Sequence, residues 1–120
     1  MRSRKVLVVD DDADWRSFLA DSLQELGYEP SEAEDGQQAL SKLDDETYGV
    51  VLLDLSMPGM SGEDVAKQIP NDGPRVVFLT GRPVHEVSAA LMQGAHYYLP
   101  KGATKQQLSL LLDSLNEARG

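Results

Sequence analysis

Short apolar runs alternate along this chain with segments whose apolar residues recur at helical spacing. The first run, Lys5 to Val9, is apolar at every position after the lysine, so a strand there would need cover on both of its faces. Strands of that kind are typical of parallel sheets, whose faces are covered by helices. The alternation therefore predicts an α/β protein built around a parallel sheet.

Five strand-and-helix units fill the chain, which at 120 residues is the size of one domain. The expected strands lie at 5–9, 28–33, 50–53, 75–79 and 97–100, and the expected helices at 13–26, 36–43, shortly before 69, from 83 onwards and at 104–117. Pro30 cannot donate a ladder hydrogen bond, so the second strand is expected at a sheet edge. Five such units indicate a doubly wound sheet across one domain, residues 1–120.

The helical periodicity predicts which side chains face the core. In the first helix the expected inner face comprises Trp15, Phe18, Leu19, Ser22, Leu23 and Leu26. In the last helix it comprises Leu108, Leu111, Leu112 and Leu115. Leu110 falls outside that stripe and is expected to be exposed. Asp12 and Asp14 are both interpreted as candidate caps of the first helix, and Asp35 as the cap of the second.

Charge and residue usage exclude several classes of function. The net charge of −9 argues against nucleic-acid binding by this chain, because phosphate contacts need a positive surface. Cysteine is absent, which excludes disulfides and thiolate metal sites. The apolar run after the basic start ends at three aspartates, too soon for a signal peptide, and no other run is long enough to cross a membrane. We therefore expect a cytoplasmic protein.

Acidic residues follow two of the predicted strands. Asp10 and Asp11 end the first strand, and Asp54 ends the third. In a doubly wound sheet the carboxyl ends of the strands meet at one edge, so these carboxylates should lie close together. Such a cluster repels itself unless a cation occupies it or some of the acids are protonated. Carboxylate oxygens suit Mg²⁺, and the sequence therefore predicts a magnesium site.

The remaining strand ends carry groups that suit phosphoryl transfer. Thr80 ends the fourth strand, and Lys101 follows the fifth. A carboxylate such as that of Asp54 can attack phosphorus to give an aspartyl phosphate. The transferred oxygens then need a metal ion, an ammonium group and hydroxyl donors around them. Together these residues indicate a site that accepts a phosphoryl group.

These motifs, in this order, resemble the receiver domains of two-component response regulators, in particular the chemotaxis-regulator type. The resemblance rests on Val8-Val9-Asp10-Asp11, on Asp35-Gly36 followed by Ala39-Leu40, on Asp54-Leu55-Ser56-Met57-Pro58-Gly59-Met60-Ser61-Gly62, on Leu79-Thr80-Gly81, and on Gly94-Ala95 before Tyr98 and Lys101. It covers essentially the whole chain. It implies a flavodoxin-like sheet of five parallel strands in the order 2-1-3-4-5, with helices on both faces.

The resemblance also implies a role for each site residue. Asp54 would be the phosphoacceptor. Asp11, Asp54 and the carbonyl of Ser56 would ligate Mg²⁺, with Asp10 acting directly or through water. Thr80 and Lys101 would contact the phosphoryl group, and the small Gly81 would leave its approach open.

Partners follow from the same resemblance. The phosphoryl donor would be a phosphohistidine on a sensor histidine kinase or a histidine phosphotransfer protein. Tyr98 would be an aromatic switch that changes position together with Thr80. Binding of targets, or formation of a homodimer, would use the fourth helix, the fifth strand and the fifth helix. The protein would be a switch that assists its own phosphorylation and dephosphorylation rather than a conventional enzyme.

The chain departs from the family pattern directly after Lys101. The family usually has a proline there, often after a cis peptide bond, whereas this chain has Gly102. A cis bond before a residue other than proline costs about 3 kcal/mol, so we expect a trans bond and a more mobile loop. Gly59 and Gly62 are interpreted as turn formers in the loop after Asp54.

Three other functions fit parts of the pattern. A haloacid-dehalogenase-type hydrolase also uses an aspartate and Mg²⁺, but it expects Thr or Val where this chain has Asp14. A flavodoxin-like flavin carrier would need a loop rich in Ser, Thr and Gly after the first strand, where three aspartates would repel the phosphate of the flavin. A receiver-like interaction module that is never phosphorylated stays open as an alternative.

Overall fold

The computed structural model describes residues 3–70, 72–81 and 97–119. Its strands are β1 (Lys5–Val9), β2 (Glu29–Ala33), β3 (Val50–Asp54), β4 (Arg75–Thr80) and β5 (Tyr97–Pro100). Its helices are α1 (Ala13–Glu25), α2 (Gly36–Asp45), α3 (Gly62–Lys67) and α5 (Lys105–Arg119). The helix predicted from residue 83 onwards lies outside the described residues. Within them, no helix has the length and apolar character needed to span a membrane.

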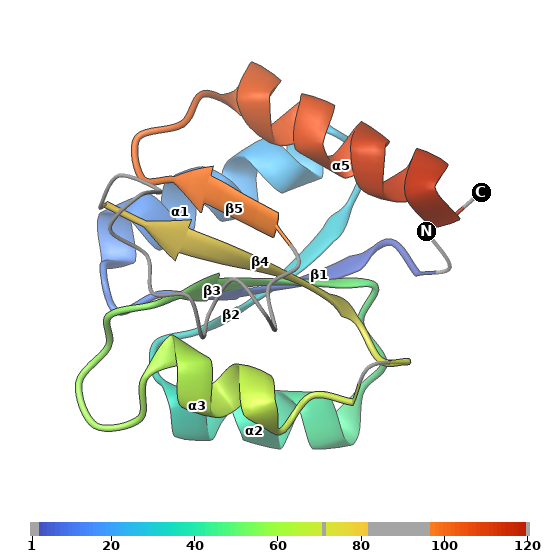
Figure 1. The fold of residues 1–120 in the computed structure, drawn as a ribbon. Coiled ribbons are helices and arrows are strands. Elements are labelled where there is room, and N and C mark those ends of the chain that lie inside the picture. Colours follow the sequence, from blue (N-terminus) through green and yellow to red (C-terminus); the bar gives the residue numbers. More distant parts are fainter. Residues whose placement is uncertain (1–2, 71, 82–96, 120) are drawn as a thin grey trace.

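The strands form one parallel sheet in the order β2-β1-β3-β4-β5, which confirms the predicted doubly wound topology. Helices α1 and α5 cover one face, and α2 and α3 cover the other (Figure 1). Strand β2, which contains Pro30, lies at an edge as predicted, because proline cannot serve a central strand.

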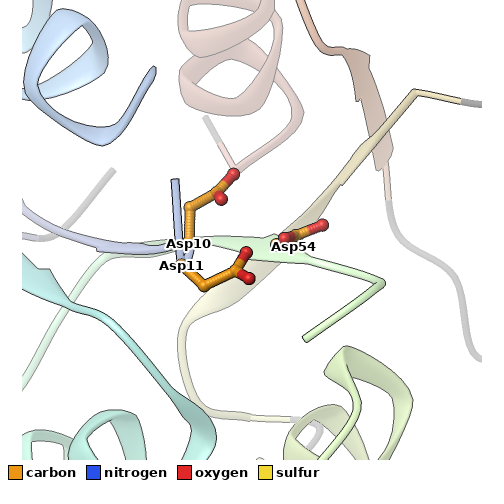
Figure 2. A group of neighbouring side chains, drawn as sticks. All are labelled: Asp10, Asp11 and Asp54. Atoms are coloured by element: carbon orange, nitrogen blue, oxygen red, sulfur yellow. The ribbon is translucent and has the colours of Figure 1, made fainter. Parts of the chain in front are cut away.

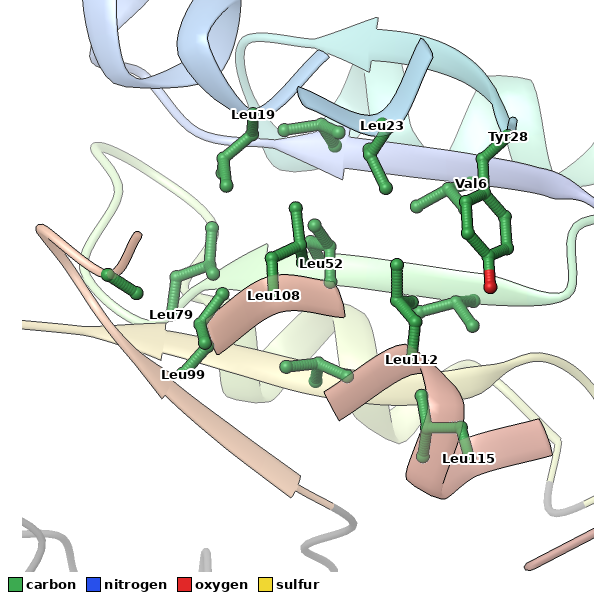
Figure 3. Packing of buried hydrophobic residues seen from close by; sticks show 14 residues of the cluster. Val6, Leu19, Leu23, Tyr28, Leu52, Leu79, Leu99, Leu108, Leu112 and Leu115 are labelled. Carbon is green, nitrogen blue, oxygen red and sulfur yellow. The ribbon is translucent and has the colours of Figure 1, made fainter. Parts of the chain in front are cut away.

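Successive side chains of the central strands point to opposite faces of the sheet and pack into two separate hydrophobic cores. Val6 and Val8 of β1 pack with Leu19 and Leu23 of α1 and with the leucines of α5 (Figure 3). Leu7 and Val9 face the opposite side, in the core beneath α2 and α3. This division explains why Val6 to Val9 of β1 and Val50 to Leu53 of β3 are all apolar: each of these residues is buried on one face or the other.

Side-chain caps fix where the helices begin. The carboxylate of Asp12 accepts hydrogen bonds from the N–H groups of Asp14 and Trp15, so Asp12 caps α1 and Asp14 lies in its first turn instead of capping it. Asp35 caps α2, as predicted. Ser61 and Asp64 form a reciprocal capping box at the start of α3.

Two exposed apolar side chains test the predicted helix faces. Leu110 of α5 is 61% exposed, as predicted, while Leu108, Leu112 and Leu115 are buried. The placement of Phe18 on the inner face of α1 was wrong, because its side chain is 40% exposed. Its ring stacks on that of Trp15, with centroids 5.3 Å apart. Phe18 therefore lies on the flank of the helix and not beneath it.

Candidate functional site

The register of the sheet brings the predicted site residues to one edge. Val9 pairs with Leu53, so Asp10 follows β1 beside Asp54 at the end of β3. Thr80 of β4 pairs with Pro100 of β5, which precedes Lys101. The backbone N–H of Lys101 extends this pairing by donating to the carbonyl of Thr80 at 2.9 Å. Four strand ends thus present polar side chains to a common space.

Asp10, Asp11 and Asp54 form a carboxylate cluster at this edge (Figure 2). One ligand oxygen from each lies within 4.8 Å of the others. Asp10 is fully buried and Asp54 is 1% exposed, whereas Asp11 faces solvent. Two buried acids and one exposed acid would hold a cation at the protein surface with water on its outer side.

Each buried acid uses one of its two oxygens in the loop that follows it. Asp10 Oδ1 accepts from the N–H of Asp12 at 2.9 Å, and Asp54 Oδ1 accepts from the N–H of Ser56 at 3.1 Å. Both Oδ2 atoms are buried without a hydrogen bond of acceptable geometry. Burying a carboxylate oxygen without a hydrogen bond costs free energy. A donor set made only of oxygen atoms also suits Mg²⁺. The residues present therefore fit the metal.

The ammonium of Lys101 partly balances these charges. Its Nζ lies 3.2 Å from Asp54 Oδ2 and 3.5 Å from Asp10 Oδ2. Partial burial lowers the pKa of Lys101, but the nearby carboxylates of Asp54 and Asp10 outweigh that effect and raise it overall. Lys101 is therefore a fixed positive charge in the site at neutral pH.

The pKa of Asp54 is raised to about 6. Burial is the main cause, and the neighbouring Asp10 carboxylate adds to it, while the Ser56 N–H and Lys101 act in the opposite direction. One ammonium does not neutralise three clustered carboxylates. The metal-free site therefore retains an unfavourable negative charge, which a divalent cation would relieve.

The loop after Lys101 accommodates glycine where the resembling family has proline. Gly102 has φ +91°, and no peptide bond among the described residues is cis, which agrees with the trans bond predicted before it. Ala103 is buried, and Thr104 and Gln107 exchange hydrogen bonds at the start of α5. These contacts lie where the loop joins α5. The ammonium of Lys101, at the start of the loop, lies beside Asp54 and Asp10.

Three further predicted site residues are Ser56, Thr80 and Tyr98. Ser56 is exposed directly after Asp54, and Thr80 is buried at the end of β4. Tyr98 is half-buried, with its ring tilted against Phe78 at a centroid distance of 5.9 Å. Burial raises the pKa of the Tyr98 hydroxyl. The structure thus places the predicted site residues at the same edge of the sheet except Tyr98, which lies within β5, paired with Phe78 two residues before Thr80.

Gly62 has a role that its interpretation as a turn former missed. It is the first residue of α3, and a Cβ on it would lie 2.2 Å from the backbone carbonyl oxygen of Asp54. Glycine is needed there because α3 begins close to the backbone at the end of β3. Gly59, with φ +77°, does form a turn in the same loop, as predicted.

Arg16 is a site neighbour that the sequence reasoning did not identify. Its Nη1 donates to the backbone carbonyl of Asp10 at 2.6 Å. One signal could have revealed it: Arg16 shares a helical stripe with the buried Ala20 and Leu23, where a charged residue needs a partner.

Comparison with known proteins connects this geometry to a family. A family model described as the response regulator receiver domain matches residues 6–113. The chain is 37% identical over 116 residues to the chemotaxis protein CheY1 of Helicobacter pylori, covering 91% of this chain and 94% of that protein. It is 34% identical over 106 residues to the uncharacterized transcriptional regulatory protein YrkP of Bacillus subtilis. That match covers 87% of this chain but only 46% of YrkP, so the chain spans about half of such relatives.

Solved structures agree with the sequence matches. The response regulator TrrA of Thermotoga maritima, in complex with Mg²⁺ and BeF, superposes with a TM-score of 0.82 at 35% identity, covering 92% of this chain and 97% of that one. TrrA in complex with the histidine kinase ThkA gives a TM-score of 0.81 at 34% identity, with the same coverage.

Proposed function

Because this chain belongs to the response regulator receiver domain family of two-component systems, we propose that it accepts a phosphoryl group on Asp54 with Mg²⁺ bound beside it. The observation that carries the proposal is the buried carboxylate cluster with the Lys101 ammonium 3.2 Å from Asp54 Oδ2. These are the charges that phosphoryl transfer to a carboxylate requires.

Asp10, Asp11, Asp54 and the carbonyl of Ser56 would hold the Mg²⁺, with Asp10 acting directly or through water. When bound, Mg²⁺ supplies neutralising charge to the transferred phosphoryl oxygens. The TrrA structure with Mg²⁺ and BeF supports this assignment, because it is a relative of similar fold and 35% identity.

Asp54 would be the nucleophile. One of its carboxylate oxygens forms a bond to phosphorus while the bond from phosphorus to the donor's imidazole nitrogen breaks, and the imidazole leaves with the electron pair. The raised pKa of about 6 leaves the reactive carboxylate form in the majority at neutral pH. Lys101 pairs with the phosphoryl oxygens, and the Thr80 hydroxyl donates to one of them.

The donor would be a phosphohistidine on a sensor histidine kinase or a histidine phosphotransfer protein in the cytoplasm. The complex of TrrA with ThkA supports a kinase partner. Contacts of the phosphoryl group with Thr80 and Lys101 would favour one of two conformations, and Tyr98 would move with them. The protein would thus act as a switch that assists its own phosphorylation and dephosphorylation.

Phosphorylation of Asp54 is tested with acetyl phosphate and Mg²⁺. The wild type should gain one phosphoryl group that hydroxylamine removes, because acyl phosphates react with that nucleophile. Asp54→Asn should gain none, since an amide is a poor nucleophile. The measurement is the intact mass before and after hydroxylamine treatment.

Asp35→Asn is the matched control, because asparagine also caps helices and Asp35, the cap of α2, is not a member of the carboxylate cluster. This variant should be phosphorylated like the wild type. Stable labelling of a serine, threonine or histidine would refute the assignment. Turnover of a generic phosphomonoester would instead support a hydrolase.

The proposed partner surface comprises β5 and the outer face of α5, together with the expected fourth helix, which lies outside the described residues. It can be tested at Leu110. A beryllofluoride mimic of the phosphoryl group should strengthen self-association of the wild type, and Leu110→Lys should weaken it by placing a charge at an exposed apolar contact. Sedimentation with and without the mimic is the measurement.

Gln37→Lys adds the same charge on α2, across the sheet from α5, and should associate like the wild type. Phosphorylation of Asp54 should be unchanged in the Leu110 variant. A wild type that stays monomeric with the mimic at high concentration would contradict the homodimer.

A further inference from the structure

The Arg16 guanidinium connects the backbone of Asp10 to Glu32 of β2. Its Nη1 donates to the carbonyl oxygen of Asp10 at 2.6 Å, and its Nε donates to Glu32 Oε1 at 3.0 Å. Its side chain is only 15% exposed. A charge buried to this degree has lost much of its hydration, so the two contacts must orient it closely.

The carbonyl that Arg16 holds belongs to the peptide unit joining Asp10 to Asp11. The residue is also held from its other side, because the Asp10 N–H donates to the carbonyl of Ala33 at 3.1 Å. The Asp12 N–H then fixes the Asp10 side chain at 2.9 Å. A change in the backbone torsions on either side of the Asp10–Asp11 peptide would redirect one carboxylate relative to the other, and it would break the contact with Arg16.

We propose that Arg16 is a positioning residue for the metal site, which holds the Asp10–Asp11 backbone so that both carboxylates face Asp54. This inference rests on the proposed function, because it concerns affinity for the same Mg²⁺. Arg16 reaches the ion only through the backbone of its ligands. Groups that orient metal ligands in this way typically change metal affinity by about tenfold to a hundredfold when removed.

Two simpler roles predict different results. A purely electrostatic Arg16 would repel Mg²⁺, so removing its charge would tighten binding, and lysine would behave like arginine. A purely structural Arg16, tying α1 to β2 through Glu32, would affect thermal stability alone. A positioning role requires the planar fork, which lysine cannot reproduce because it offers a single ammonium.

Titration calorimetry with MgCl₂ at a temperature where every variant is folded separates these roles. Arg16→Lys should weaken Mg²⁺ binding about tenfold although it keeps the charge. Arg16→Met should also weaken it, against the electrostatic expectation. Lys5→Met is the control: it removes an exposed cation paired with Glu46 at the opposite end of β1, and it should bind Mg²⁺ within about twofold of the wild type.

The outcomes are distinct. Weaker binding by Arg16→Lys, with the Lys5 control unchanged, supports the positioning role. Binding equal to the wild type, or tighter binding by Arg16→Met, overturns it. If both arginine variants fail to fold, Glu32→Asp decides, since it keeps the charge but withdraws the carboxylate from the guanidinium: weaker binding supports the role and unchanged binding overturns it. A wild type that binds no Mg²⁺ would instead overturn the proposed metal site itself.

Discussion

Metal-free protein with Asp54→Asn should be more stable than the wild type at about pH 8, by as much as about 3 kcal/mol. The pKa of Asp54 in the folded protein is raised from 3.8 to about 6. A raised pKa contributes stability that is fully present below the unfolded value and is lost as the pH rises through about 6. Above that pH the folded wild type carries a buried charge that asparagine lacks.

Urea unfolding in the presence of a chelator measures this difference. The advantage of the variant should shrink as the pH falls from about 8 to about 5, because the carboxyl of Asp54 becomes protonated in the folded state. Asp10, Asp11 and Lys101 are the charged groups that face Asp54.

Two further measurements serve as the control for this prediction and as a test of its cause. Asp113→Asn, at an exposed position on α5, should change the free energy of unfolding by less than about 0.5 kcal/mol. Saturating Mg²⁺ should stabilise the wild type far more than the Asp54 variant, because the ion neutralises the charge that asparagine has already removed. A variant that is no more stable than the wild type at about pH 8 would show that repulsion in the cluster does not oppose folding.

The side chains that meet at the strand ends could be predicted because two physical rules determine their placement. Continuous apolar runs imply covered parallel strands, and parallel strands end at one edge of the sheet. Asp10 and Asp54 therefore had to be neighbours once both strands lay in the centre of the sheet, as the register of Val9 with Leu53 confirms. The site was predictable because it depends on topology more than on side-chain detail.

Phe18 shows where periodicity stops being informative. Helical spacing gives the direction of each side chain, and Phe18 lies about 100° around α1 from the buried Leu19. Whether a side chain at that angle is covered depends on the neighbouring elements. Here the ring stacks on Trp15 and stays partly in solvent.

Arg16 and Gly62 required the tertiary structure for a different reason. The contact of Arg16 with the Asp10 carbonyl joins α1 to the end of β1 and depends on how the helix sits on the sheet. The sequence alone does not distinguish a loop glycine that supplies a positive φ, as Gly59 does, from one that leaves room for a neighbouring backbone, as Gly62 does. Only coordinates distinguish those two uses.

Gly62→Ala should destabilise the protein by about 3 kcal/mol or more, although alanine is ordinarily the better helix former. Gly62 begins α3 and donates its N–H to the carbonyl of Leu55 at 3.2 Å. The added Cβ would lie 2.2 Å from the carbonyl oxygen of Asp54 and 3.0 Å from Leu55 Cα. Both are backbone atoms of the strand end, which cannot move aside as a flexible side chain could.

Gly81→Ala is the matched control for urea unfolding, because a Cβ built on Gly81 has no heavy atom within 4 Å among the described residues other than its chain neighbours, and its φ is not positive. It should change the free energy of unfolding by less than about 1 kcal/mol. Where the Gly62 variant remains folded, its Mg²⁺ affinity should also fall, since relief of the clash must displace either α3 or the backbone of Asp54. Wild-type stability and Mg²⁺ affinity in this variant would mean that the loop after Asp54 does not depend on close approach at Gly62.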